Sequence, residues 1–359
     1  MAVSIMLKPA SSLCNLKCRY CFYSSVASER EAYSKGFMEM KTAENVIKSA
    51  LSLAKGTPVI FTFQGGEPAL RGIEFYKEFV KICSEENNLN SQIAYCFQTN
   101  ATLLDDEWCR FFKENNFLVG VSLDGNEQQN AYRVYPNGES SFENVMNAVA
   151  LLKKYNVSFN ILSVVTKQLA LSVRDNYKFL KQNGINNVQY INCLKPLSGE
   201  YDSEVYMNDN DYECFLNNSF RLYYNDNMRG GRLSVRSFDN YLMLLSGSDA
   251  EQCNMNGFCS PQFVVEGDGT VYPCDFFCTD EYELGNINEL SFFDISKSEA
   301  FIGFLKNGCT ISEECRNCDY FALCRGGGCK RYALDGDFCS VYKKFFSSSV
   351  SMMKNMIGR

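Results

Sequence analysis

The sequence predicts an α/β protein: a partial (β/α)6 barrel of the TIM type, followed by a small cysteine-rich region. Three observations predict this fold. Short apolar runs rich in β-branched and aromatic residues recur through the first part of the chain, and the stretches between them carry helical periodicity. Ten of the eighteen cysteines fall between Cys253 and Cys339. The six predicted strands are 3–8, 58–63, 92–98, 117–123, 158–165 and 187–192.

Residues that commonly cap helices precede three of the intervening segments. Asp105 stands before DEWCRFFKE, Ser141 before FENVMNAVALLKKY and Ser172 before VRDNYKFLKQ. In parallel α/β barrels the loops that leave the C-terminal ends of the strands carry the chemistry. A cluster of cysteines, residues 14–21, follows the first predicted strand. We therefore expect the active site at that end of the barrel.

The pattern changes after residue 230. The segment 262–275 predicts a β-hairpin, because two strand-like arms flank the turn sequence Gly267-Asp268-Gly269. Loops rich in glycine and cysteine follow, and a terminal helix is expected from about Val341. We predict three parts: a barrel over 1–231, a cysteine-rich domain over 232–340 and a C-terminal helix over 341–359.

Composition excludes several classes of partner. The net charge of −7 and the pI near 5.0 argue against nucleic acid or an anionic membrane. No apolar run is long enough to cross a bilayer, and the first residues lack the basic region of a secretory signal. We expect a cytoplasmic protein in which the cysteines are reduced thiols or metal ligands.

The stretch CNLKCRYC places three cysteines in an eight-residue loop. A closed zinc site needs four ligands, and the chain contains no histidine. Three thiols without an obvious fourth ligand suggest a metal centre with one open position. A zinc site or a structural cysteine loop is the alternative that this spacing leaves open.

The motif resembles that of the radical S-adenosylmethionine (radical SAM) enzymes, C-x3-C-x2-C with an aromatic residue before the last cysteine. Cys14, Cys18, Tyr20 and Cys21 match it. The resemblance implies that three thiolates hold three irons of a [4Fe–4S] cluster, whose fourth iron binds S-adenosyl-L-methionine. One electron from the cluster then releases a 5′-deoxyadenosyl radical.

A second motif, QGGEP, follows the second predicted strand. By the same resemblance this loop binds the methionyl amino group, and its glycines allow a close approach of the backbone. The family pattern also implies that Arg133 binds the carboxylate of the cofactor. The implied cofactor-binding residues are Tyr20, Gln64, Gly65, Gly66, Glu67, Ser122, Arg133 and Leu194.

The C-terminal cysteines resemble the SPASM extension, which binds two auxiliary [4Fe–4S] clusters. The resemblance assigns Cys253, Cys259, Cys274 and Cys329 to the first cluster and Cys315, Cys318, Cys324 and Cys339 to the second. Cys278 and Cys309 are alternatives to Cys329. A pair of zinc ribbons would also use such spacings. Together with the first cysteine loop, the pattern implies three [4Fe–4S] clusters.

Within this group the chain resembles the anaerobic sulfatase-maturating enzymes. The most specific matching stretches are IMLKPASSLCNLKCRYCFY and CNMNGFCSPQFVVEGDGTVYPCDF. These enzymes oxidise a cysteine or serine of a sulfatase to Cα-formylglycine. The resemblance makes Asp275, directly after Cys274, the general base that takes a proton from the substrate. An aspartate in a loop is otherwise a turn or capping residue.

The resemblance also implies partners. We expect an unfolded sulfatase or peptide with a Cys/Ser-x-Pro-x-Arg-like motif, and a flavodoxin- or ferredoxin-type electron donor. We expect a monomer. Tyr23 is a candidate contact to substrate or cofactor, or else a core aromatic. Two other functions stay open: a SPASM maturase that forms thioether or carbon–carbon crosslinks in a ribosomal peptide, and a non-catalytic metal-binding protein.

Overall fold

In the computed structural model, residues 2–308, 311–329, 331 and 338–358 are described. Their strands form one ten-stranded sheet in the order β10-β9-β8-β1-β2-β3-β4-β5-β6-β7. The strands are β1 Val3–Leu7, β2 Val59–Phe63, β3 Ile93–Thr99, β4 Leu118–Ser122, β5 Ser158–Val165, β6 Asn187–Asn192, β7 Ser234–Val235, β8 Phe263–Val265, β9 Thr270–Tyr272 and β10 Gly285–Asn286.

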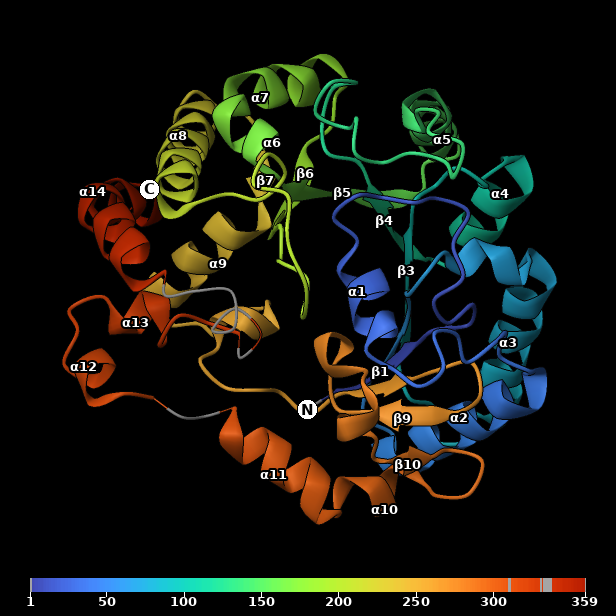
Figure 1. The fold of residues 1–359 in the computed structure, drawn as a ribbon. Coiled ribbons are helices and arrows are strands. Elements are labelled where there is room, and N and C mark those ends of the chain that lie inside the picture. Colours follow the sequence, from blue (N-terminus) through green and yellow to red (C-terminus); the bar gives the residue numbers. More distant parts are fainter. Residues whose placement is uncertain (1, 309–310, 330, 332–337, 359) are drawn as a thin grey trace.

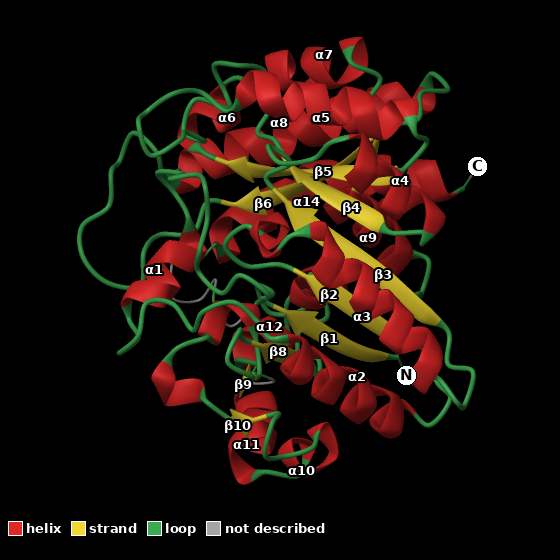
Figure 2. Ribbon diagram, turned by 90° about the vertical axis from the view of Figure 1, so that its right-hand side faces the viewer, coloured by secondary structure: helices red, strands yellow, loops and turns green. Residues whose placement is uncertain are grey.

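The six predicted strands are confirmed as β1 to β6. They pair in parallel and in chain order, and the end strands β7 and β10 do not pair with each other. In Figure 2 they follow one another as a curved ladder. The sheet is therefore a partial barrel, as the sequence predicts, and its open edges are extended by the short strands of the C-terminal part.

Helices cover the outer side of this sheet, and α2 to α8 follow its strands around the molecule (Figure 1). None of the helices in the described part of the chain is long and apolar enough to cross a membrane. The α-helices are α1 Phe22–Ser28, α2 Met40–Ala54, α3 Ile73–Glu86, α4 Asp106–Glu114, α5 Phe142–Lys154, α6 Lys167–Leu171, α7 Val173–Gln182, α8 Asp209–Met228, α9 Arg236–Leu245, α10 Phe292–Ser296, α11 Glu299–Asn307, α12 Glu313–Arg316, α13 Phe321–Cys324 and α14 Cys339–Ile357.

The predicted hairpin is present as β8 and β9, which pair antiparallel around the turn that contains Gly269. Its position in the sheet is not evident from the sequence. Strand β8 pairs in parallel with β1, so that Phe263 lies opposite Ile5 and Val265 opposite Leu7. The cysteine-rich part of the chain thus continues the barrel sheet at its first strand.

The three predicted capping residues behave differently. The Asp105 carboxylate accepts hydrogen bonds from the backbone N–H groups of Glu107 and Trp108, at 2.9 and 3.0 Å, and caps α4. Ser141 and Ser172 occupy the positions before α5 and α7 but make no side-chain cap bond. Their hydroxyl groups instead donate to backbone carbonyl groups elsewhere, that of Ser141 to Arg133.

Replacement of Asp105 tests the cap. Asp105→Ala removes the acceptor for two N–H groups, so the free energy of unfolding should fall by about 1 kcal/mol. Asp105→Asn is the matched control, because asparagine caps helices as well as aspartate does. Urea titration of the two variants measures the difference. Equal stability of Asp105→Ala and Asp105→Asn would contradict the assigned cap.

Candidate active site

The loop that carries the first three cysteines lies at the C-terminal end of β1, held by the loops that follow neighbouring strands. The N–H of Glu67, after β2, donates to the carbonyl of Leu13 at 2.8 Å. Asn100, after β3, donates its amide to the Asn15 side chain at 2.9 Å. The N–H of Lys17 donates to the carbonyl of the residue after Arg133 at 2.7 Å. Three barrel loops thereby fix the path of the cysteine loop.

The three thiols of this loop lie near one another. Cys14 and Cys21 are exposed residues and Cys18 is half-buried. Burial raises the pKa of Cys18 to about 11, an effect that Arg133 opposes and Cys21 reinforces. Such a thiol becomes a thiolate at neutral pH when a metal coordinates it. The donor set of this loop therefore fits an iron–sulfur cluster.

The loop after β2 turns sharply at two glycines. Gly65 and Gly66 have φ angles of +100° and +51°, which favour glycine. The Glu67 side chain does not point to solvent; it is fully buried and accepts bonds from the N–H groups of Ala69 and Asn100. A third bond comes from the hydroxyl of Thr99 at 2.8 Å. Burial raises the pKa of Glu67 to about 7, although these three donors act in the opposite direction.

The structure brings Tyr20 and Arg133 together around a third residue. Arg133 and Asp124 form a bidentate pair: Nε of Arg133 lies 3.1 Å from Oδ2 of the carboxylate, and Nη2 lies 3.1 Å from Oδ1. The Tyr20 hydroxyl donates to the same carboxylate, and the guanidinium lies 5.4 Å from the centre of its ring. All three side chains are buried. Asp124 is not part of the motifs that predicted the site, although an acid just after an apolar strand signals a special role.

The other two residues expected at the cofactor lie at the ends of β4 and β6. Ser122 ends β4, and its hydroxyl accepts a bond from the Gln98 amide at 3.0 Å. Leu194 is buried just after β6. Both therefore lie at the same edge of the barrel as the cysteine loop.

Asp275 lies at the start of the 3-10 turn η3 (Asp275–Phe277), after strand β9. Strand β9 pairs with β8, which pairs with β1, so the hairpin lies beside the first strand of the barrel. Lys8, the residue after β1, makes an ion pair with the Asp275 carboxylate. The Gln64 amide donates to the other oxygen of Asp275 at 2.6 Å. The predicted base and the first residue of the glycine loop are thus in direct contact.

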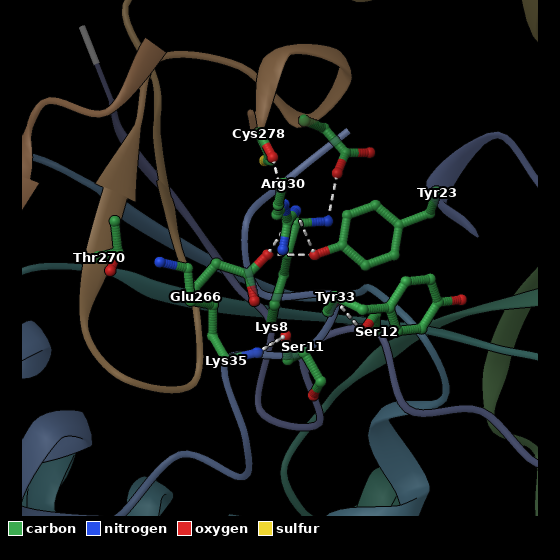
Figure 3. A network of polar contacts seen from close by, with 12 residues as sticks. Lys8, Ser11, Ser12, Tyr23, Arg30, Tyr33, Lys35, Glu266, Thr270 and Cys278 are labelled. Carbon is green, nitrogen blue, oxygen red and sulfur yellow. Dashed lines mark hydrogen bonds and ion pairs between the residues drawn. The ribbon is translucent and has the colours of Figure 1, made fainter. Parts of the chain in front are cut away.

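Lys8 belongs to a buried group of charged side chains that the sequence motifs did not predict (Figure 3). Beside it, Arg30 pairs with Glu266 at 3.0 Å, and the Tyr23 hydroxyl donates to Glu266. Burial by itself would lower the pKa of Lys8, but Asp275, Cys278 and Glu266 raise it above its usual value. A lysine directly after an apolar strand, in LKP, was the available sequence signal. Tyr23, left open by the sequence, is a member of this group.

The second predicted set of auxiliary cysteines lines a single pocket. Cys315 lies in α12, Cys324 ends α13 and Cys339 begins α14, with Cys318 in the turn between α12 and α13. Burial above all, and in addition Cys339 and Cys315, raise the pKa of Cys324 to about 11. Four thiols around one pocket are the ligand number of an auxiliary cluster.

The first predicted auxiliary set comes from three segments that meet. The thiols of Cys274 and Cys329 interact electrostatically. A side chain at Gly257 would meet the Arg325 carbonyl at 2.7 Å, and one at Gly328 the Asn254 carbonyl at 2.5 Å. The loop 253–259, with Cys253 and Cys259, therefore lies against the loop 325–329.

The alternatives for this set are placed differently. Cys278 is fully buried next to Lys8, and Cys309 lies outside the described residues.

In the part of the chain that the structure describes, no three Cys, His, Asp or Glu side chains converge as ligands of a single metal ion. A [4Fe–4S] cube requires a wider arrangement, since each thiolate binds a different iron.

Comparison with known proteins agrees with this geometry. Family models match residues 9–180, as the radical SAM superfamily, and residues 257–319, as an iron–sulfur cluster-binding domain (SPASM). The chain is 40% identical to a cysteine-type anaerobic sulfatase-maturating enzyme of Clostridium novyi, over 98% of this chain and 96% of that one. It is 30% identical to a serine-type enzyme of Bacteroides thetaiotaomicron, over 98% of this chain and 90% of the other.

A solved structure extends the likeness to the fold. The structure of anSMEcpe with bound AdoMet and Cp18Cys peptide superposes with a TM-score of 0.94 at 38% identity, and covers all of this chain and 99% of its own. The cysteine loop, the glycine loop and the SPASM cysteines all fall in the matched region. The chain belongs to the anaerobic sulfatase-maturating enzymes, radical SAM enzymes with an iron–sulfur SPASM domain.

Proposed function

We propose that this enzyme oxidises a cysteine residue of a sulfatase to Cα-formylglycine. The observation that carries the proposal is the buried Asp275 carboxylate, held by Lys8 and Gln64 beside the cysteine and glycine loops. Cysteine as the substrate residue is supported by the higher identity to cysteine-type than to serine-type relatives, 40% against 30%. Both of these relatives are sulfatase-maturating enzymes, which favours sulfatase maturation over peptide crosslinking.

We assign the cofactor sites as follows. Cys14, Cys18 and Cys21 would hold three irons of one [4Fe–4S] cluster, leaving one iron for S-adenosyl-L-methionine. When bound, this pair supplies a 5′-deoxyadenosyl radical. The residues that would surround it are Tyr20, Gln64, Gly65, Gly66, Glu67, Ser122, Arg133 and Leu194. The auxiliary clusters would be held by Cys253, Cys259, Cys274 and Cys329, and by Cys315, Cys318, Cys324 and Cys339.

Two of these cofactor residues have protein partners that limit what they can do. Arg133 already binds Asp124 through two nitrogens, so it would contact a cofactor carboxylate with the rest of its guanidinium. Glu67 ties the loop after β2 to the loop after β3 through its three hydrogen bonds. We therefore expect Glu67 to shape the glycine loop through its side chain, with the backbone of that loop facing the cofactor.

Asp275 would act after a hydrogen atom has left the substrate's β-carbon. The oxidation is complete when one proton has also left and one further electron has passed to an acceptor, a role that an auxiliary cluster would fill. Asp275 accepts this proton; Lys8 and Gln64 keep its two oxygens in place until then. Water then converts the oxidised product, a thioaldehyde, to formylglycine and hydrogen sulfide.

The proposed partners follow from this reaction. The substrate is an unfolded peptide with a Cys-x-Pro-x-Arg-like motif, and a flavodoxin- or ferredoxin-type protein supplies electrons. We propose a monomeric enzyme divided into a barrel over 1–231, a SPASM domain over 232–340 and a helix over 341–359. A cytoplasmic location fits reduced cysteine ligands.

Loss of the first cysteine loop tests the cofactor assignment. The unaltered protein, reconstituted without oxygen, should hold about twelve irons, and conversion of Cys14, Cys18 and Cys21 to Ala should leave about eight. Cleavage of S-adenosyl-L-methionine should be abolished. Cys214→Ala, at an exposed thiol of α8, is the control and should keep the full iron content. About four irons in the unaltered protein would contradict the SPASM assignment.

Gly66 tests the contact between the two loops. A side chain there would meet the Leu13 carbonyl at 2.1 Å, so Gly66→Ala should displace the cysteine loop. We expect loss of about four irons per chain and of S-adenosyl-L-methionine binding. Gly138→Ala has a similarly positive φ, +87°, but meets nothing within 4 Å, and should keep both. Iron content and S-adenosyl-L-methionine binding are measured for both variants. If Gly66→Ala keeps all of its iron and its binding, the contact between the two loops is refuted.

Asp275→Asn tests the function itself. The substitution keeps the shape of the side chain but removes its ability to take a proton, which typically costs about a hundredfold or more in rate. With a Cys-x-Pro-x-Arg peptide, the variant should still form 5′-deoxyadenosine but little formylglycine by mass spectrometry. Asp268→Asn, in the hairpin turn, should react normally. If the unaltered enzyme oxidises neither a Cys nor a Ser peptide, the proposed function is wrong.

A further inference from the structure

Lys8 stands in a row of polar residues that follows three paired strands. Val265, Leu7 and Phe63 lie side by side in β8, β1 and β2. The next residues along these strands are Glu266, Lys8 and Gln64, and the register continues, because the Lys8 N–H donates to the Val265 carbonyl and the Gln64 N–H to that of Leu7. Residues in register on neighbouring parallel strands point to the same side of a sheet. The row therefore presents an acid, a lysine and an amide at the end of the barrel.

Two members of this row hold Asp275. The Lys8 ammonium group binds one carboxylate oxygen, and the Gln64 amide binds the other at 2.6 Å. The third member, Glu266, is paired with Arg30 at 3.0 Å and bonded by the Tyr23 hydroxyl. The group thus contains two cations and two carboxylates, and Lys8 is the cation that contacts Asp275.

The Lys8 side chain has little freedom to leave this contact. It is fully buried, and its ammonium group lies 3.6 Å from the centre of the Tyr23 ring. Gly65 also lies against it: a side chain at this position would come within 2.8 Å of Lys8 Cγ and 3.1 Å of Nζ. The absence of a side chain at Gly65 is thus what gives the lysine its space. A residue enclosed in this way holds its partner in one position.

We propose that Lys8 is a positioning residue for the oxidation: its ammonium group, together with the Gln64 amide, fixes the Asp275 carboxylate relative to the barrel loops. The inference rests on the proposed role of Asp275 as the base. Asp275 comes from the SPASM region, whereas the first cysteine loop belongs to the barrel. Lys8 joins the two, so that the base stays at a fixed distance from the substrate carbon on which the radical acts.

Lys8→Met tests the proposal, because methionine keeps the length of the side chain and removes the charge. Radical formation does not need Lys8, so 5′-deoxyadenosine should form at a rate near that of the unaltered enzyme. The yield of formylglycine per 5′-deoxyadenosine should fall by about tenfold to a hundredfold, since a misplaced base fails to take the proton. Lys35→Met is the matched control: Lys35 lies 3.7 Å from Asp268 in the hairpin turn and should leave the yield unchanged.

A double variant separates positioning from a general effect on the fold. If Lys8 acts through Asp275, then Lys8→Met should lower the yield of Asp275→Asn no further. A wild-type yield in Lys8→Met, or losses that multiply in the double variant, would overturn the proposal. Removing one partner of a buried ion pair can destabilise a protein strongly, whereas removing both costs less. If Lys8→Met does not fold, Lys8→Gln replaces it, because glutamine retains a hydrogen-bond donor without the charge. The yield of this variant should fall, but by less than the fall expected for Lys8→Met. A wild-type yield in Lys8→Gln would overturn the proposal.

A second measurement does not depend on activity. Thermal unfolding midpoints of the four iron-loaded proteins, unaltered, Lys8→Met, Asp275→Asn and double, should be non-additive if the pair exists. Additive shifts would remove the contact on which the inference rests. Failure of the unaltered enzyme to make formylglycine would instead refute the proposed function, and the unfolding midpoints would still report on the pair.

Discussion

The parallel pairing of β8 with β1 is the constraint on which the rest of the structure depends. It joins a hairpin from the C-terminal part of the chain to the first strand of the barrel, through the pairs Ile5–Phe263 and Leu7–Val265. These two strands are separated by more than half of the sequence, so closing this contact orders a long stretch of chain. The hairpin then lies beside β1, and Asp275, which follows it, pairs with Lys8, the residue after β1.

Buried ion pairs fix the positions of side chains at the C-terminal edge of the barrel strands. Three such pairs lie there: Arg133 with Asp124, Lys8 with Asp275, and Arg30 with Glu266. A buried charge without a partner is costly, and removing one partner of such a pair typically costs about 3–5 kcal/mol. These pairs are therefore weak evidence for stability but strong evidence for position, because each carboxylate is held from two directions. In the second pair, the base that we propose is held by residues of the barrel.

The cysteines divide according to how the chain positions them. Those at 14–21 lie on a loop fixed by three barrel loops through backbone and amide hydrogen bonds. A second set, Cys315, Cys318, Cys324 and Cys339, lines one pocket between short helices and the start of α14. The set that includes Cys274 depends on contacts between three segments, in which glycines let backbones approach closely. The last set is thus the one whose assembly depends most on the tertiary fold.

The sequence by itself determined the strands of the barrel, the hairpin and the two cysteine-rich regions, because alternation, turn residues and motif spacing are local properties of the chain. It also pointed to Asp275, through the residues around it. The tertiary structure alone decided what these residues contact. Ser141 and Ser172 stand where capping residues stand, but their hydroxyl groups found other acceptors. The positions of Asp124 and Lys8, charged residues just after apolar strands, signalled a special role but did not identify their partners. Their partners lie nine and 267 residues away, and a local pattern carries no information about which distant side chain will neutralise a buried charge.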